Sequence, residues 1–297
     1  MIIETDGLAK RFGRHEAVQN LNLAVPEGAT CALIGANGAG KTTTMRMLVN
    51  LLAPDRGRAR VLGVDSRALR RTDRQRIGYV SESQTLPERL SVGQYFHYLR
   101  SLYTNWDAGL EQQLRAQFEL PPSRSLGKLS RGMRMKAMLI GALSFRPKLL
   151  ILDEPLSGLD PLVRDEVLSG ILGQAVETAI LISSHELAEL ESCTTHVAFM
   201  VHGRLLFQEP IESLGARLRE VTATLTGGAD RGALPDTWLN VQVDGPLLRF
   251  VDTAFVNEAN LLAQVQRRCG TVLHLEAQAL SLRDISKALM RATRRET

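Results

Sequence analysis

Hydrophobic and polar positions change their spacing several times along the chain, and each change predicts a different kind of element. Over the first 35 residues apolar and polar side chains alternate between turn signals such as Pro26–Gly28, which predicts short strands. The segment 30–35 is apolar enough for a strand that is buried on both faces. A helix is expected from Gly40 to about Leu52, because Pro54 cannot continue it.

Between about residues 85 and 145 the spacing becomes helical, and three amphipathic segments follow one another. Two short aliphatic runs come next, "KLLILDEP" and "TAILISSHE". Each is bounded by charged or polar residues and predicts a buried parallel strand. Because these strands alternate with helices, we expect an α/β domain with a parallel sheet covered on both faces.

After about residue 215 the alternation with a period of two returns. The segments "EVTATLTGG" and "LNVQVDGPLLRFVDT" predict strands, and Asp244-Gly245 in the second is a hairpin signal. A helix near 255–268, a strand over "TVLHLEAQ" and a last helix from Ser281 complete this part, with Asp284 in a capping box.

We therefore predict two domains, for which 297 residues are sufficient. The first covers residues 1–215 and includes a helical subdomain at about 85–145. The second, residues 216–297, is a small accessory α+β domain in which no catalytic constellation is found.

Composition narrows the classes of function. Hydrophobic residues make up 44% of the chain and charged residues 23%, which is typical of a globular protein. The net charge of +4 does not require a nucleic acid as partner, and none is expected. The cysteines Cys31, Cys193 and Cys269 have no metal-like spacing and indicate a reducing compartment. We find no signal peptide and no apolar run of the roughly 18 residues that a membrane span needs, so a membrane role requires a partner protein.

The strongest chemical motif is "GANGAGKT", residues 35–42, which matches G-x-x-x-x-G-K-[ST] between a predicted strand and a predicted helix. Its glycines let backbone N–H groups surround a phosphate, and the helix start adds partial positive charge. Lys41 can reach the β- and γ-phosphates, and the Thr42 hydroxyl can bind Mg²⁺. The residues expected at the nucleotide are Gly35, Asn37, Gly38, Ala39, Gly40, Lys41, Thr42 and Thr43.

Two further strand ends reach the same edge of the predicted sheet. Asp153 follows the aliphatic run in "LLILDEP" and can hold Mg²⁺ there, while Glu154 is placed to accept a proton from an attacking water. His185 ends the strand in "AILISSH", and we expect it to contact the γ-phosphate. Structural roles are expected for the other histidines, which are His15, His97, His196, His202 and His274.

A second segment also has the chemistry of an anion site. "KLSRGMRMK", residues 128–136, predicts a helix start capped by Ser130 with a glycine beside it. The chain therefore contains two candidate phosphate sites, well separated in sequence.

Taken in order, these motifs resemble those of the ATP-binding subunit of ATP-binding cassette (ABC) transporters, over residues 1 to about 215. "GANGAGKT" resembles the Walker A loop, "LLILDE" the Walker B strand, "LSRGM" the signature motif and His185 the switch histidine. Phe12 falls where the family has an aromatic residue that stacks on adenine. The segment "SGLD" resembles the D-loop and comprises Ser157, Gly158, Leu159 and Asp160.

This resemblance implies a P-loop NTPase fold of ABC type, with a mixed-sheet core, N-terminal antiparallel strands and a helical subdomain. It also implies a head-to-tail dimer in which the signature helix of one copy caps the ATP on the Walker A loop of the other. Ser130, Arg131, Gly132 and Met133 would then face the partner's nucleotide. The implied catalytic residues are Glu154, His185 and Lys41, the cofactors are ATP and Mg²⁺, and the residues near the metal are Thr42, Asp153 and Glu82.

Two departures from the family pattern stand out. Arg131 and Met133 occupy signature positions where glycine and glutamine are more common. In "IGYVSESQ" the Q-loop glutamine is expected at Glu82, which is a carboxylate, with Gln84 as the alternative. A glutamate there could approach Mg²⁺, but it would lie awkwardly beside the γ-phosphate.

Segments such as "SLYTNWD" and "SGLDPLVRDEVL" resemble ATPase subunits of ABC-2-type exporters, a class that includes antibiotic and multidrug efflux systems. We therefore expect an ATP-hydrolysing motor subunit on the cytoplasmic face of the cell membrane. Its expected partners are integral membrane permease subunits and a second ATP-binding subunit, identical or related.

Two alternatives stay open at this point. One is a soluble ABC ATPase that acts on the ribosome or on DNA, which the single Walker A motif and the lack of a long coiled-coil insertion disfavour. The other is an ATP-gated regulatory module with negligible turnover, which is suggested by the carboxylate at Glu82.

Overall fold

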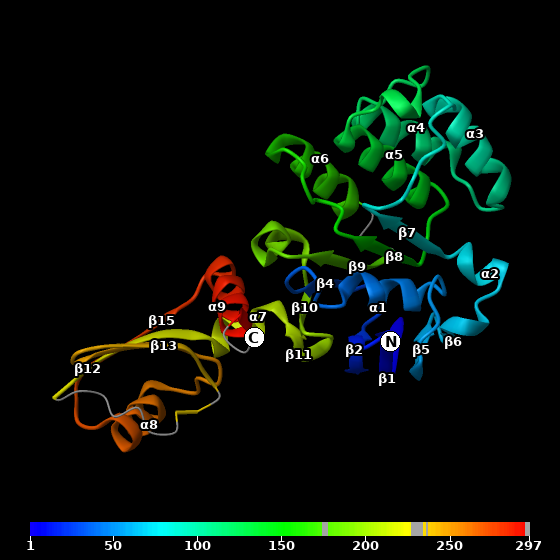
Figure 1. Cartoon of the computed structure of the whole chain (residues 1–297). Helices are drawn as coiled ribbons and strands as arrows, with labels where there is room; N and C mark the ends of the chain where they lie inside the picture. The colour runs from blue at the N-terminus through cyan, green and yellow to red at the C-terminus, as the bar shows by residue number, and fades with distance from the viewer. Residues whose placement is uncertain (174–177, 227–233, 236, 295–297) are drawn as a thin grey trace. The chain divides into compact units, whose positions relative to one another are not determined.

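Figure 1 shows the chain as a computed structural model, which describes residues 1–173, 178–226, 234–235 and 237–294. The chain divides into two compact units, one formed by 1–185 and 192–208 and the other by 186–191 and 209–297. The expected boundary at residue 215 falls inside helix α7 (Ile211–Arg217), so the division into functional domains stays a prediction. None of the helices in the described part of the chain combines the length and apolarity of a membrane span.

The first unit begins with an antiparallel sheet in the order β2-β1-β5-β6, with β3 paired to β1. At the start of β1 the side chains of Ile3, Thr5 and Leu8 are buried and those of Glu4 and Asp6 are exposed. This confirms the strands that the alternating pattern predicts. The strands are β1 (Ile3–Phe12), β2 (His15–Leu21), β3 (Ala24–Val25), β5 (Arg56–Val61) and β6 (Val64–Asp65).

A six-stranded sheet lies at the centre of the first unit, in the order β11-β10-β4-β9-β8-β7. The strands from β10 to β7 pair in parallel, and every residue of β4, β8 and β9 is buried. The parallel sheet predicted from the aliphatic runs is therefore confirmed. Its strands are β4 (Thr30–Ile34), β7 (Ile77–Ser81), β8 (Leu149–Asp153), β9 (Ala179–Ser184), β10 (His196–Val201) and β11 (Arg204–Pro210).

Helix α1 (Lys41–Leu48) follows β4 directly, and it ends before the expected Leu52 because Asn50 has a left-handed backbone with φ 57°. Helices α3, α4 and α5 lie together above β7 in Figure 1, in the part of the chain where a helical subdomain is expected. The remaining helices in this unit are α2 (Arg71–Arg74), α3 (Val92–Leu102), α4 (Ala108–Gln117), α5 (Arg131–Leu143) and α6 (Pro161–Leu172), with short 3₁₀ helices at η1 (Ser66–Ala68) and η2 (Leu126–Lys128). A further 3₁₀ helix, η4 (Glu191–Cys193), crosses the boundary between the units in sequence.

The second unit contains an antiparallel sheet in the order β13-β14-β12-β15. Its core includes Trp238 and Phe250, whose rings stack with centroids 4.0 Å apart. The hairpin predicted at Asp244-Gly245 is confirmed, with φ 55° at Gly245. The end of the segment "EVTATLTGG", at residues 227–228, lies outside the described residues. The elements are β12 (Arg219–Leu225), β13 (Trp238–Asp244), β14 (Leu247–Asp252), β15 (Val272–Ala279), α8 (Glu258–Cys269), α9 (Leu282–Arg294) and the 3₁₀ helix η3 (Leu187–Glu189).

Candidate functional site

The phosphate loop lies between the end of β4 at Ile34 and the start of α1 at Lys41. Two of its glycines are required by packing, since a Cβ on Gly35 would lie 2.4 Å from the Met200 carbonyl oxygen and one on Gly40 only 2.3 Å from that of Ala17. Gly38 differs, because its φ is +84° and a Cβ there would point into open space. The tip of the loop therefore leaves room for a phosphate next to the backbone.

Lys41 crosses this loop. Its side chain is only 5% exposed, and its Nζ donates hydrogen bonds to the carbonyl oxygens of Gly35, at 2.5 Å, and Ala36, at 3.2 Å. The same Nζ lies 3.0 Å from Oε1 of Glu154. A buried ammonium held by carbonyl and carboxylate oxygens offers an anion a counter-charge at a defined point.

Thr42 and Asp153 lie together at the edge of the sheet, where a metal was expected. Thr42 Oγ1 donates to Oδ1 of Asp153 at 2.9 Å, and the hydroxyls of Ser183 and Ser81 also donate to this buried carboxylate, at 3.1 and 3.4 Å. The hydroxyl and the carboxylate are oxygen donors of the kind that Mg²⁺ prefers. No group of three or more His, Cys, Asp or Glu that could hold a metal occurs among the described residues. Binding of Mg²⁺ by Thr42 and Asp153 therefore stays a prediction.

Glu154 and His185 form the next contact along this edge. The backbone of Glu154 has φ +51°, and its N–H donates to Ser183 Oγ at 2.8 Å. This conformation brings Oε2 to 3.3 Å from Nδ1 of His185, whose side chain is 45% exposed. Oε1 of Glu154 is buried, and its contact in the structure is the ion pair with Lys41 at 3.0 Å. The role of Glu154 as acceptor of a proton from water stays a prediction.

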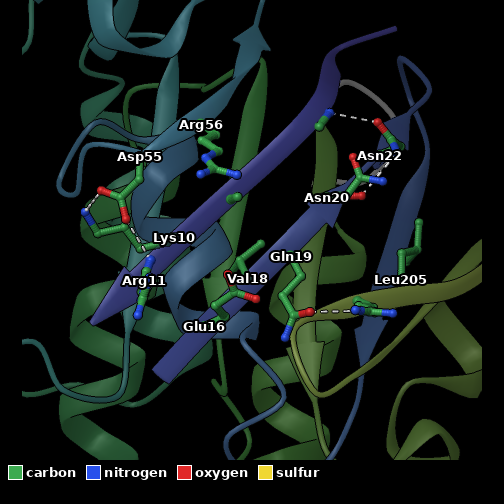
Figure 2. A pocket seen from close by; sticks show the side chains of 13 residues that line it. Lys10, Arg11, Glu16, Val18, Gln19, Asn20, Asn22, Asp55, Arg56 and Leu205 are labelled. Atoms are coloured by element: carbon green, nitrogen blue, oxygen red, sulfur yellow. Dashed lines mark hydrogen bonds and ion pairs between the residues drawn. The ribbon is translucent and has the colours of Figure 1, made fainter. Parts of the chain in front are cut away.

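Phe12 lies at the end of β1, where it is 50% exposed and has Lys10 Nζ 5.7 Å from its ring centroid. Its ring is therefore available for stacking, and the contact with adenine stays a prediction. A separate hollow, shown in Figure 2, lies over β1 and β2. Its volume is about 750 Å³, and Lys10 and Asp55 at its side form an ion pair of 2.8 Å. The residues that line this hollow include none of the phosphate loop, so it is separate from the phosphate site.

The signature segment starts α5. Ser130 is exposed, and its Oγ accepts a hydrogen bond from the Met133 N–H at 3.2 Å, so this hydroxyl caps its own helix. Gly132 is buried, and a Cβ there would lie 2.6 Å from Cγ1 of Val163 on α6. The sequence interpretation, which gave Gly132 to phosphate approach, missed this packing contact between the two helices.

The Q-loop and D-loop segments lie beside these groups. The Glu82 N–H donates to the carbonyl oxygen of Asp153 at 3.2 Å, and the Glu82 side chain pairs with Arg131. Gln84 is exposed, and its N–H bonds to the Ser81 carbonyl oxygen at 3.0 Å. In the D-loop Ser157 is half-buried, Gly158 has φ +63°, Leu159 is buried, and Asp160 caps α6 by accepting from the Val163 N–H at 3.1 Å.

Two serines in this cluster, Ser81 and Ser183, were not singled out from the sequence, although both occupy the polar ends of otherwise apolar strands, β7 and β9. Polar residues at such strand ends are the signal that could have found them.

Comparison with known proteins decides the family. A family model described as "ABC transporter" matches residues 18–157. The bacitracin transport ATP-binding protein BcrA of Enterococcus faecalis is 33% identical over 225 residues, which are 74% of this chain and 73% of the relative. The chain belongs to the ABC transporter ATP-binding proteins.

Other members of the family agree with this assignment. The daunorubicin/doxorubicin resistance ATP-binding protein DrrA of Streptomyces peucetius is 35% identical over 243 residues, covering 77% of this chain and 73% of that one. A solved structure titled "Structure of ATP binding subunit of ABC transporter" has a TM-score of 0.67 and 28% identity, and covers 73% of this chain and 92% of its own. The predicted ABC-type fold and the prediction of an ATP-binding ATPase are thereby confirmed at the level of the family.

Proposed function

We propose that this ABC ATPase is the motor subunit of a membrane exporter and that it hydrolyses ATP as a head-to-tail dimer. The observation that carries the proposal is the pairing of Lys41, Glu154 and His185 in one cluster, while the capped helix start at Ser130 is exposed. The cluster supplies one half of a hydrolysis site. The helix start supplies hydrogen-bond donors and partial positive charge that a second copy can use.

In this proposal each residue has a defined task. Lys41 exchanges its carbonyl partners for the β- and γ-phosphates, and Glu154 takes the proton of the attacking water. His185 stays in contact with Glu154 and stabilises the charge on the transferring phosphoryl group, as does Ser130 of the second copy. Mg²⁺, held by Thr42 and Asp153, would neutralise charge on the phosphate oxygens.

The assignment to an exporter has separate support. The relatives' names refer to bacitracin transport and to daunorubicin/doxorubicin resistance. ABC ATP-binding subunits work with membrane permease components, so we place this chain on the cytoplasmic face of the cell membrane with integral permease subunits as partners. Co-purification from a detergent extract of the native membrane tests this placement, because the permease must be recovered with the ATPase.

The hydrolysis claim is tested by Glu154→Gln, which removes the proton acceptor and keeps the shape. We expect steady-state ATPase activity to fall by at least about 100-fold while MgATP still binds. The matched control is Glu27→Gln, the same change on an exposed loop, and it should leave turnover unchanged. Undiminished turnover in Glu154→Gln would overturn the proposal.

A regulatory module with negligible turnover is the competing function, and the carboxylate at Glu82 is the observation that favours it. Its prediction is distinct, because MgATP would bind and close the dimer without phosphate release. Measuring inorganic phosphate over many turnovers of the wild-type chain separates the two functions.

A further inference from the structure

Two residues that depart from the family pattern contact each other. Nη2 of Arg131 pairs with Oε1 of Glu82, although the two residues are 49 positions apart in sequence. Their side chains are 52% and 43% exposed, and ion pairs as exposed as this one contribute little to stability. Stability alone therefore does not account for the pair, and the residues around it indicate a functional role.

The same guanidinium also contacts the D-loop. Nη2 of Arg131 lies 3.5 Å from Oγ of Ser157, and a Cβ on Gly158 would lie only 2.4 Å from Nη1. Gly158 has φ +63°, a conformation that favours glycine. The missing Cβ also leaves space for the Arg131 guanidinium. One side chain thus joins the signature segment, the D-loop and the Glu82 loop.

The loop that contains Glu82 begins at the end of β7, beside the Asp153 carboxylate where Mg²⁺ is expected. Ser81 lies opposite Asp153 in the register of β7 and β8, and the Glu82 N–H donates to the Asp153 carbonyl oxygen at 3.2 Å. An unpaired carboxylate at this place would add negative charge next to Asp153, Glu154 and a bound triphosphate. Arg131 supplies the counter-charge from the same protomer.

We propose that Arg131 is a positioning residue that holds the Glu82 carboxylate against the D-loop and so keeps it from repelling the γ-phosphate. This inference rests on the proposed function, which puts ATP on the phosphate loop. Its consequence is that the two unusual residues act as one unit. Loss of Arg131 alone should weaken ATP binding, and removal of the Glu82 charge as well should reverse that loss.

The test is a double-mutant cycle with Arg131→Gln, Glu82→Gln and the double variant, in the full chain. Dissociation constants are measured with fluorescent analogues of ATP and ADP, and KM and kcat for MgATP are measured in parallel. We expect Arg131→Gln to weaken ATP binding about five- to tenfold more than ADP binding, because only ATP carries the γ-phosphate. The double variant should bind ATP no more weakly than Glu82→Gln alone.

A second ion pair on the same helix provides the control. Arg134 on α5 pairs with Glu88 at 3.7 Å, so Arg134→Gln and Glu88→Gln repeat the same chemistry one turn further along. This second cycle should leave the ratio of ATP to ADP affinity unchanged.

The positioning role would be overturned if the losses of ATP affinity in Arg131→Gln and Glu82→Gln multiplied in the double variant. An equal loss of ATP and ADP binding, or a lower melting temperature of Arg131→Gln without a change in the affinity ratio, would also overturn it. Failure of the proposed function would give a different result, because the wild-type chain would then bind ATP without hydrolysis that depends on Glu154. The ratio of ATP to ADP affinity in the Arg131 variants would still test the role of Arg131.

Discussion

The two phosphate-type segments of this chain are built in different ways. In the loop 35–42, packing requires two of the glycines, and Lys41 is buried and held by three oxygens of its own protomer. At the signature segment Ser130 is exposed and its hydroxyl bonds to its own helix. The first segment has its positive charge in place, whereas the second has an exposed helix start. We expect such a difference if, as proposed, two copies share one site.

The largest effect is expected from a substitution in the phosphate loop, residues 35–42. Lys41→Ala removes the buried counter-charge of the phosphates, so ATP hydrolysis should fall by at least about 100-fold and ATP binding should weaken. Isothermal titration with ATP and a phosphate-release assay measure both. The control is Lys148→Ala at an exposed position, which should change neither quantity. Strong ATP binding by Lys41→Ala would show that the loop is not the nucleotide site.

Ser130→Asp tests the exposed segment. Aspartate is as good a helix cap as serine, so the melting temperature should be kept, while its charge would repel a phosphate on the second copy. We expect at least about tenfold slower ATP hydrolysis with unchanged binding of ATP to the monomer. Ser123→Asp, on the exposed loop before α5, is the control. Full activity of Ser130→Asp would mean that this hydroxyl is only a cap.

Gly132→Ala separates packing from phosphate approach at the same segment. The added Cβ would meet Cγ1 of Val163 at 2.6 Å, so we expect a loss of about 1–3 kcal/mol in the free energy of unfolding. Urea denaturation measures it. If Val163→Ala in the same chain restores stability and activity together, the glycine serves helix packing; if it restores stability alone, the glycine also serves the nucleotide.

The smallest effect concerns the strand beneath the phosphate loop. Burial raises the pKa of the Cys31 thiol on β4 to about 12, so almost none of it is thiolate at pH 8. Because the raised pKa keeps the thiol protonated until the pH rises toward that value, iodoacetamide should leave Cys31 unmodified in the folded chain at pH 8. Mass spectrometry reads the result. Rapid alkylation would mean that β4 opens and that the loop is less rigid than its packing indicates.

The parts of the site that lie at strand ends could be predicted from sequence, because an apolar run of fixed length places the next polar residue at the edge of the sheet. Asp153, Glu154 and His185 follow such runs, and the structure brings all three to one edge. The N-terminal and C-terminal antiparallel strands followed from alternation for the same reason.

Contacts that depend on how helices pack could not be predicted in this way. The pairing of Arg131 with Glu82 and the packing of Gly132 on Val163 depend on the placement of α5 against β7 and α6, which no local pattern records. The end of α1 was also missed, because the left-handed turn at Asn50 ends the helix before Pro54 does.

The central claim is that the signature segment of one copy meets the phosphate loop of another. Two variants with one added cysteine each test it directly, Asn37→Cys and Ser130→Cys, and each also carries Glu154→Gln to stop hydrolysis. The three native cysteines stay in place, because they are buried. The two variants are mixed with MgATP and treated with a short bis-maleimide cross-linker. The account predicts a covalent dimer that joins residues 37 and 130, formed in the mixture but in neither protein alone, and only with nucleotide. A mixture that gives no such product, or gives it equally without ATP, would contradict the account.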